Sequence, residues 1–512
     1  MRHISNILLF LLAALLITQA AFSLQWPITH DEAPLLYEAF LMQTEGRVPY
    51  RDIFDFQMPG SFAAYYALAR LSGFGYFRLR ILDLGILAAL LTVTFLREAK
   101  RGFGKPTALA AALLFGLKYM QGGAYMSLQR EYLLLIFIAL AVWINMRDAL
   151  TFKHRLLIGF FFGLAAVIKP HAAIGLIPIL LFDIIDIIQR RKLTLLTLSP
   201  LGNAAARSIL PASAGFAIPV FMVIAWLALT GALIPFIDIA RNYWPLYAQI
   251  NGQMEITAQG TRIPFLLTQS LRLGGNGIWL IPAALGVYLV PHEQKKHAYL
   301  LASLALCYAI YPALSGQFFE YHYIPFVYFI VLLASLTFVP LPSPSTRQLS
   351  PFILHLSSFI LFAVILANIR PSSTFILQIN GRPIAKTTDR AEEIARYLEE
   401  NLEDGDTVQP LDWTGGALLA MLETRAHIAT PYVFDFYFYH HVSTPYIQSL
   451  RADFMSDLQG AYPRFIVEVT AIDKPWISGQ DTTREFPELR AFLNENYSVT
   501  IREDDYVIYE RR

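Results

Sequence analysis

Two adjacent carboxylates, Asp31 and Glu32, follow His30 shortly after the first apolar stretch of the chain. A carboxylate at a membrane surface can take a proton from a nucleophile or bind a cation, provided that it lies within hydrogen-bond reach of that group. Acidic residues also stand often at the N-terminus of a helix, where the helix dipole favours negative charge. From these residues alone, a catalytic role and a solvated helix start are both open.

The composition places these carboxylates in a membrane protein. The 512 residues are 55% hydrophobic and only 15% charged, with a mean hydropathy of +0.45, which is too apolar for ordinary soluble domains. Residues 1–369 carry 42 charged side chains and a net charge of +10, whereas residues 370–512 carry 37 and a net charge of −9. We therefore predict a polytopic membrane domain over residues 1–369 and a small soluble α/β domain over residues 370–512.

The composition excludes nucleic-acid binding and two kinds of cysteine chemistry. Neither part has the dense basic stripe of a nucleic-acid-binding protein. Cys307 is the single cysteine, so disulfides within the chain and cysteine-based metal sites are excluded.

Apolar segments recur along the membrane part and predict about eleven transmembrane helices. Several are shorter than the roughly 20 residues that a span needs, so flanking Tyr, Trp, Lys or Arg must complete them. The segments are 7–24, 81–96, 107–119, 132–146, 156–168, 172–188, 209–233, 278–290, 298–312, 324–339 and 351–369.

The basic residues of the short loops predict the orientation. If Met1 starts in the cytoplasm, the cytoplasmic loops hold 15 Lys and Arg in about 63 positions, against 10 in about 126 positions outside. An odd number of spans then places residues 370–512 outside the cytoplasm. We expect a multi-pass protein of the plasma (inner) membrane with a cytoplasmic N-terminus and an extracytoplasmic C-terminal domain.

The C-terminal part has the pattern of alternating helices and strands. Thr388 or Asp389 could cap a helix, with Glu392 closing a capping box. No GxGxxG or P-loop pattern indicates nucleotide binding there. Further expected elements are the buried stripe Ile394, Tyr397 and Leu398 of that helix, strands at 407–411, 465–469, 498–501 and 506–509, and a helix opened by Pro487 with Leu489, Phe492 and Leu493 inward.

The first outer loop, residues 25–80, is far longer than a connection between two helices requires. Together with three later motifs, it resembles the GT-C superfamily of polyprenyl-phosphate-sugar-dependent glycosyltransferases, in particular the protein O-mannosyltransferase, aminoarabinose transferase and rhizobial lipopolysaccharide transferase group. The matching residues are the acidic pair, Tyr37, Ala39, Gly46, Pro49-Tyr50-Arg51-Asp52 and Pro59-Gly60, followed by Gln129-Arg130-Glu131, Lys169-Pro170-His171, and Tyr321-His322 with Pro325.

The resemblance implies roles for the acidic residues. Asp31 would be the general base that deprotonates an acceptor hydroxyl, with Glu32 beside it in the catalytic site. Glu32, Glu131 or Asp52 could orient the acceptor or hold a divalent cation, Mg²⁺ or Mn²⁺. For Glu131 an ion pair with Arg130 at the membrane edge is an equal alternative.

The resemblance also implies a set of cations for the donor phosphate. Arg130 and Lys169 are the main candidates to neutralise the lipid phosphate that leaves. The alternative for Lys169 is snorkelling to the membrane interface. His322 could bind phosphate or acceptor, although a histidine between tyrosines at a helix end is more often structural.

One departure from the family pattern concerns Gln57, where relatives commonly carry lysine. A further basic residue is often found near Gln317. The missing cations shift phosphate binding to Arg51, Arg130 or Lys169, or indicate a different donor or an inactive relative. His427, His440 and His441 in the C-terminal part lack an acidic pattern of known spacing, so a zinc site is not expected there.

The sequence thus predicts an inverting glycosyltransferase that moves a sugar from a polyprenyl-phosphate donor to a glycan, lipid or protein acceptor at the outer face of the membrane. A transporter or flippase for lipid-linked substrates is the alternative, and a non-catalytic relative on the same scaffold is a third. Ionisable residues inside membrane spans would favour transport. The candidates are Asp83, Lys118, Asp183 and Asp186.

Overall fold

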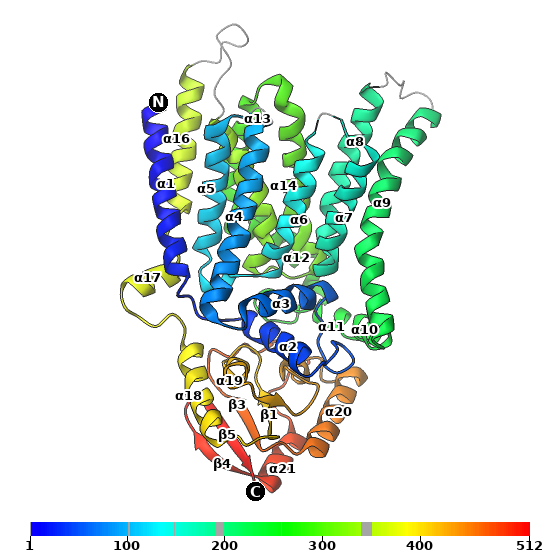
Figure 1. The fold of residues 1–512 in the computed structure, drawn as a ribbon, viewed down its shortest axis with the longest axis vertical. Helices are drawn as coiled ribbons and strands as arrows, with labels where there is room; N and C mark the ends of the chain where they lie inside the picture. Colours follow the sequence, from blue (N-terminus) through cyan, green and yellow to red (C-terminus); the bar gives the residue numbers. More distant parts are fainter. Residues whose placement is uncertain (1, 101–102, 148, 191–197, 258, 339–350) are drawn as a thin grey trace. The chain divides into compact units, whose positions relative to one another are not determined.

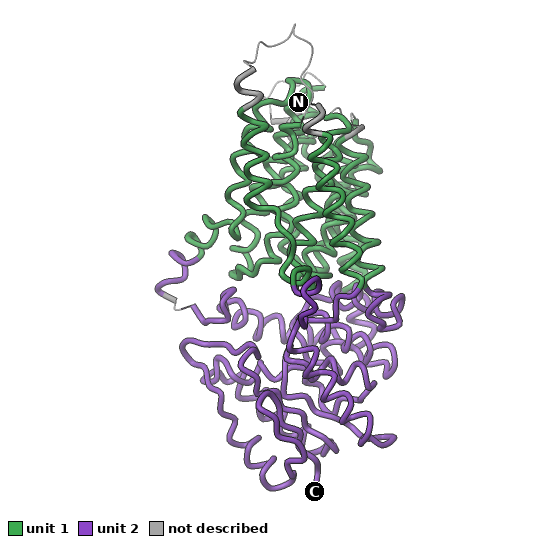
Figure 2. Tube along the Cα trace, turned by 90° about the vertical axis from the view of Figure 1, so that its left-hand side faces the viewer, with its two compact units in different colours: residues 1–24, 80–223, 266–376 green, residues 25–79, 224–265, 377–512 purple. Residues whose placement is uncertain are grey.

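The chain folds into two compact units, each assembled from three separate stretches of sequence (Figure 2). Unit 1 comprises Met1–Leu24, Arg80–Val223 and Leu266–Ile376, and unit 2 comprises Gln25–Leu79, Ile224–Phe265 and Leu377–Arg512. The computed structural model describes residues 2–100, 103–147, 149–190, 198–257, 259–338 and 351–512.

All eleven predicted apolar segments form helices in the described residues, and Figures 1 and 2 show those of unit 1 as a bundle. The predicted polytopic helical fold is therefore confirmed. The helices are α1 (Arg2–Ser23), α4 (Tyr76–Lys100), α5 (Lys105–Gln121), α6 (Arg130–Asn145), α7 (Phe152–Ile168), α8 (Leu176–Arg190), α9 (Leu198–Leu229), α13 (Leu280–Leu289), α14 (Lys295–Ser315), α15 (Ile324–Ser335) and α16 (Pro351–Asn368).

Not every helix is long enough to cross a membrane by itself. Six described helices have the length and hydropathy of a span, or seven if α16 and α17 (Ser373–Ile379), which meet at 61°, form one broken span. The helices α5, α6 and α7 have only 16 or 17 residues. Their ends therefore need flanking polar and aromatic residues to reach the interface.

Small residues let α7 and α9 approach closely. A Cβ atom on Gly159 would lie 1.8 Å from the carbonyl oxygen of Ala212, and one on Gly215 would lie 1.9 Å from that of Leu156. Because no side chain fits there, the two backbones pack directly against each other.

Unit 2 contains a five-stranded mixed sheet in the order β2-β1-β3-β5-β4. Strand β1 (Thr407–Leu411) runs parallel to β2 (His427–Ile428) and β3 (Phe465–Val469). Strand β5 (Tyr506–Arg511) runs antiparallel to β3 and to β4 (Tyr497–Arg502). The other elements of the C-terminal stretch are α18 (Lys386–Asn401), α19 (Ala417–Thr424), the 3₁₀ turn η9 (Phe436–Phe438), α20 (Pro445–Ala461) and α21 (Pro487–Asn496).

Most predicted elements of the C-terminal stretch are confirmed, but the capping box is wrong. Helix α18 begins at Lys386 with Ala385 at the N-cap position and no side-chain cap. Thr388 and Asp389 therefore lie inside the first turn. Ile394 and Leu398 are buried as expected, whereas Tyr397 of the same predicted stripe is only half-buried. Leu489, Phe492 and Leu493 of α21 are buried as expected.

The long first loop packs with the C-terminal stretch inside unit 2. The loop contains α2 (Glu32–Thr44) and α3 (Pro59–Ser72). The hydroxyl of Tyr37 donates to the carbonyl of Ala426 at 2.7 Å, and Phe54 forms a β-bridge with Tyr432. The loop is thus a folded part of unit 2.

The segment 224–265 completes unit 2 and contains α10 (Leu233–Asn242) and α11 (Trp244–Tyr247). Trp244 donates its indole N–H to the carbonyl of Phe56 at 2.9 Å. Glu255 forms a β-bridge with Ser478. This segment therefore contacts both the first loop and the C-terminal stretch.

Candidate functional site

Unit 1 brings together Glu131, Lys169 and His322, three of the four candidate site residues in the later motifs. Lys169 Nζ donates to Glu131 Oε1 at 2.5 Å and to His322 Nε2 at 3.0 Å. His322 Nε2 also lies 3.3 Å from Glu131 Oε1. The three side chains come from positions 38 to 191 residues apart along the chain, so the fold assembles this cluster. We call it the Lys169 cluster.

The ends of three helical elements position the Lys169 cluster. Glu131 stands in the first turn of α6, Lys169 is the extended residue between α7 and η2 (Pro170–Gly175), and His322 lies in η7 (Glu320–Tyr323). Proline at position 170 stops α7 and favours the extended conformation of Lys169. Lys169 therefore lies outside the regular part of α7, and its side chain reaches Glu131.

Burial makes the electrostatics of the Lys169 cluster strong. Glu131 and His322 are almost completely buried, and the Lys169 side chain is 17% exposed. Glu131 Oε2 has no hydrogen-bond partner among the described residues. One carboxylate oxygen thus holds the lysine, and the other is available for a hydroxyl group.

The hydrogen bonds of His322 fit a neutral ring. Its Nδ1 lies 3.0 Å from the carbonyl oxygen of Gln317, which can only accept. Its Nε2 faces the ammonium group of Lys169, which can only donate. A ring protonated on Nδ1 alone satisfies both contacts, so Lys169 supplies the positive charge and His322 positions it.

Glu131 forms an ion pair with Lys169. Arg130 precedes Glu131 in the same turn, is 6% exposed, and still interacts with it electrostatically. With two cations, one carboxylate and a neutral histidine, the group carries a formal charge of +1. That charge suits a singly negative phosphodiester.

Two tyrosines, Tyr311 and Tyr321, complete the Lys169 cluster. The Tyr311 hydroxyl donates to Glu131 Oε1 at 3.3 Å from α14, and Lys169 lies 5.7 Å from the ring centroid of Tyr321. Tyr311 belongs to no motif, and its only sequence signal is its place near the end of an apolar segment.

Asp31 and Glu32 lie at the start of α2 in unit 2. Asp31 occupies the N-cap position, but its side chain makes no cap hydrogen bond, and His30 Nδ1 lies 3.3 Å from its Oδ1. Glu32 Oε2 instead accepts from the backbone N–H of Thr29 at 3.4 Å. His30 has a positive φ of 51°, an uncommon conformation for a residue other than glycine. Both carboxylates are buried, at 7% and 1% exposure.

Arg51 and Asp52 form a local pair in the first loop. Arg51 donates through Nε and Nη2 to the two oxygens of Asp52, at 2.9 and 2.7 Å. Its Nη1 donates to the carbonyl of Thr230 at 2.8 Å. The hydrogen bonds from Arg51 hold the pKa of Asp52 below its usual value. In this arrangement the positive charge of Arg51 is balanced by the negative charge of Asp52.

Gln57 and Gln317, the two positions at which the resemblance leads us to expect basic residues, lie in different units. The backbone carbonyl of Gln57 accepts from the Tyr50 hydroxyl at 2.6 Å within unit 2. Gln317 is buried in unit 1 and binds His322 through its backbone. A basic residue at position 317 would therefore adjoin the Lys169 cluster.

The three histidines that the sequence drew attention to in the C-terminal stretch each contact another protein group. His427 contacts Glu45 at 2.7 Å, His440 contacts the hydroxyl of Tyr243 at 3.0 Å, and His441 contacts the carbonyl of Leu246 at 3.1 Å. Burial lowers the pKa of His440 to about 3. Across the described ranges, no group of three or more His, Cys, Asp or Glu side chains could hold a metal ion.

The ionisable residues that could have served transport are engaged in polar contacts. Asp83 accepts from the hydroxyls of Tyr119 and Ser127. Asp183 pairs with Arg155, and Asp186 pairs with Arg190 and Lys296. Lys118 donates to Asn368.

Residues 59–214 match a family model described as dolichyl-phosphate-mannose-protein mannosyltransferase. No curated protein sequence gives a significant match. Among solved structures, the chain resembles ArnT from Cupriavidus metallidurans bound to undecaprenyl phosphate, with a TM-score of 0.57 and 12% identity, over 98% of this chain and 97% of that one. ArnT in its apo state gives the same values.

A more distant match is the archaeal oligosaccharyltransferase AglB from Archaeoglobus fulgidus, in complex with an inhibitory peptide and a dolichol-phosphate. Its TM-score is 0.46 at 11% identity, over 90% of this chain and 69% of that one. The likeness to ArnT covers nearly the whole chain and concerns the fold.

Proposed function

We propose that this chain, a membrane protein of the GT-C superfamily, is an inverting glycosyltransferase that uses a polyprenyl-phosphate sugar as donor. The observation that carries the proposal is the Lys169 cluster, in which a carboxylate and a neutral histidine hold one ammonium group in place. A preorganised cation of this kind stabilises negative charge as it develops on a leaving group. The family match over residues 59–214 includes Glu131 and Lys169.

The reaction is a single displacement at the anomeric carbon of the sugar. An acceptor hydroxyl attacks this carbon, the bond to the phosphate oxygen breaks, and the polyprenyl phosphate leaves with the electron pair. Asp31 takes the hydroxyl proton, and Lys169 and Arg130 neutralise the phosphate. Attack from the face opposite the leaving group inverts the configuration.

Glu131 fixes Lys169 through one oxygen and can bind the acceptor hydroxyl through the other. Asp31 belongs to unit 2, and its role rests on the resemblance of the first loop. The donor sugar, the choice among glycan, lipid and protein acceptors, and a divalent cation at Glu32 or Glu131 belong to the proposal. Loss of transfer in EDTA with recovery in Mg²⁺ or Mn²⁺ would support the cation, and full activity in EDTA would refute it.

Replacement of Asp31 by Asn tests the assignment of the general base. An amide cannot take the proton, so Asp31→Asn should reduce transfer at least about 100-fold. A strain that lacks the gene is complemented with wild-type or variant protein, and cell-envelope glycans are compared by mass spectrometry. Glu45→Gln, at the other end of α2, is the matched control and should restore the wild-type glycans.

Three results would contradict these assignments. Unchanged envelope glycans after deletion of the gene would contradict the transferase proposal. Full complementation by correctly inserted Asp31→Asn would show that another group is the base. If purified protein in vesicles moved a lipid-linked substrate without forming a glycosidic bond, the transporter alternative would be correct.

The proposed reaction requires unit 2 to lie outside the cytoplasm, as the loop charges predict. An alkaline phosphatase fused after Arg512 should be active, and the same enzyme fused between α4 and α5 should be inactive. The reverse pattern would place the C-terminal domain in the cytoplasm and contradict the orientation.

A further inference from the structure

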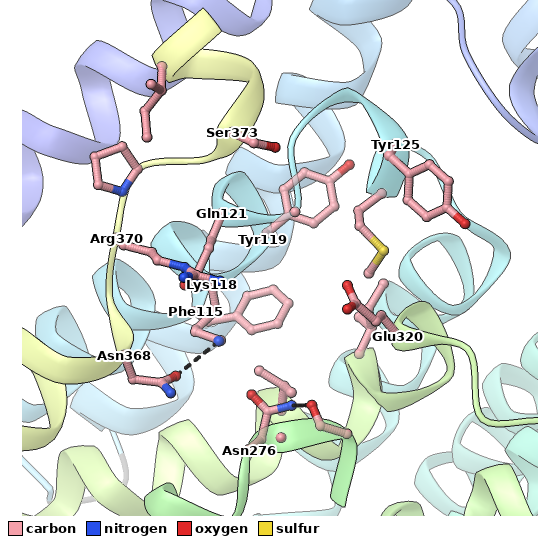
Figure 3. A pocket seen from close by; sticks show the side chains of 18 residues that line it. Phe115, Lys118, Tyr119, Gln121, Tyr125, Asn276, Glu320, Asn368, Arg370 and Ser373 are labelled. Carbon is pink, nitrogen blue, oxygen red and sulfur yellow. Dashed lines mark hydrogen bonds between the residues drawn. The ribbon is translucent and has the colours of Figure 1, made fainter. Parts of the chain in front are cut away.

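Unit 1 contains a polar cavity that shares no lining residue with the Lys169 cluster (Figure 3). Its volume is about 690 Å³, within the range of cavities that enclose a small ligand. It is lined by α5, the turn after it, residues 274–276, the break between α16 and α17, and the side chains of Glu320, Ile324 and Val327.

Two cations occupy one side of this cavity. Figure 3 shows Lys118 and Arg370 together with Gln121 on that side. Lys118 Nζ donates to Asn368 Oδ1 at 3.1 Å, and Trp279 donates to the same oxygen at 2.7 Å. Within the described part of the chain, neither cation forms an ion pair. Their positive charge is therefore available to an anionic group.

A carboxylate occupies the other side. Figure 3 shows Glu320 across the cavity from Lys118 and Arg370. The side-chain oxygen of Gln121 is buried and has no hydrogen-bond partner among the described residues. The cavity thus offers separate sites for a negative and a positive group, with an amide oxygen that can accept a further hydrogen bond.

Apolar side chains make up the rest of the lining. Phe115, Ile324, Val327 and Ile376 contribute to the wall, and Ile376 is 46% exposed. Ile324 and Val327 belong to a helix that is long and apolar enough to span a membrane, Ile376 belongs to the broken span of α16 and α17, and Phe115 belongs to the shorter apolar helix α5. A ligand with both a charged head and an apolar chain fits this combination of surfaces.

We propose that this cavity binds the headgroup of an amine-bearing membrane phospholipid, with its phosphate at Lys118 and Arg370 and its ammonium group at Glu320. The acyl chains leave past Ile376 and the apolar wall. Two cations match a phosphodiester by charge-assisted hydrogen bonds, and one carboxylate matches the amine. This site does not depend on the proposed transfer reaction, because none of its residues takes part in that reaction.

Thermal stabilisation of the purified full chain by short-chain lipids tests the proposal. A ligand that binds only the folded protein raises its melting temperature. Dioctanoyl phosphatidylethanolamine should raise it, and dioctanoylglycerol, which lacks phosphate, should not. Lys118→Gln with Arg370→Gln should weaken the lipid affinity at least about tenfold. Lys105→Gln, exposed at the other end of α5, is the matched control and should bind as wild type does.

A second variant tests the amine subsite without removing any cation. Glu320→Gln should bind phosphatidylethanolamine no better than phosphatidylglycerol, whereas the wild type should prefer the former. Because Glu320 is exposed, this variant remains informative if the double variant does not fold. Soluble phosphoethanolamine distinguishes the source, since stabilisation equal to that by the lipid would identify a free headgroup as the ligand.

Three results would overturn the proposal. The first is equal stabilisation by dioctanoylglycerol, and the second is undiminished lipid binding by the folded Lys118→Gln/Arg370→Gln variant. The third is a wild type that binds phosphatidylethanolamine and phosphatidylglycerol equally well, together with a Glu320→Gln variant whose lipid binding is unchanged.

Discussion

At the scale of single residues, Lys169 and Glu131 depend on each other. Sequence motifs placed both at the ends of apolar segments, but could not show that the two side chains form an ion pair. This pairing depends on the packing of α6 against α7, which no local pattern encodes. For the same reason the sequence did not identify Tyr311, which reaches Glu131 from α14.

Removal of Glu131 should separate stability from activity. Glu131→Gln leaves the ammonium group of Lys169 without its counter-charge in a mostly buried site, and should destabilise the protein by about 3 kcal/mol. Adding Lys169→Met removes the unpaired charge and should recover most of that loss, while transfer stays abolished in both variants. Melting temperatures in detergent and the glycan assay measure the two effects.

The control for this prediction is Asp186→Asn. Asp186 also forms ion pairs, with Arg190 and Lys296, but these two cations are about half-exposed. Its loss should therefore cost less than about 1 kcal/mol. If Glu131→Gln keeps wild-type transfer, Glu131 has no part in the reaction. If the double variant is as unstable as the single one, the unpaired charge is not the cause.

At the scale of elements, periodicity and propensity predicted much of the fold. The strands β1 and β3 have the predicted bounds, because each is a short run in which apolar residues predominate. The two-residue strand β2 was not predicted. It is defined by its pairing with Thr407 and Val408 of β1, and its own composition does not indicate a strand. The N-cap of α18 lies three or four residues earlier than predicted, because the capping signal at Thr388 and Asp389 lies within its first turn.

An ion pair between elements of unit 2 should make stability depend on pH. Glu468 on β3 accepts two hydrogen bonds from Arg490 on α21 and one at 3.0 Å from the Tyr509 hydroxyl on β5. Burial alone would raise the pKa of Glu468, but the bonds from Arg490 hold it below its usual value. The stabilisation is therefore complete at neutral pH and is lost as the pH falls through this lowered pKa.

Glu468→Gln should lower the stability at pH 7 by about 1 kcal/mol, a modest value because Arg490 is partly exposed and solvent screens the pair. The variant should also lose less stability than the wild type between pH 7 and pH 3, since it has no proton to take up. Melting temperatures across this range check both effects. Glu495→Gln, exposed on the same α21, should follow the wild-type curve, and parallel curves for Glu468→Gln and the wild type would contradict the linkage.

At the scale of the whole molecule, the chain builds each unit from three separated stretches. The break in composition at Ile369 indicated where the charged C-terminal stretch begins, but composition cannot show what that stretch packs against. Contacts such as Tyr37 with Ala426, which lie 389 residues apart, are decided by the fold alone. The first loop and residues 224–265 belong to the same unit as the C-terminal stretch for this reason.

The assembly of unit 2 from three stretches predicts that its C-terminal stretch stays bound after the chain is cut. The turn around Gly381 is exposed, and a Cβ atom there would meet nothing within 4 Å, so a protease site inserted before Pro383 should be accepted. After cleavage, residues 383–512 should still co-purify with the membrane part, because buried contacts such as that of Tyr437 with Asp55 hold them to the first loop. Deletion of residues 383–512 should instead expose α2 and make the first loop sensitive to limited proteolysis. The uncut chain with the same insertion is the control. Release of the cleaved fragment under native conditions, or an equally resistant loop after deletion, would show that the first loop folds without the C-terminal stretch.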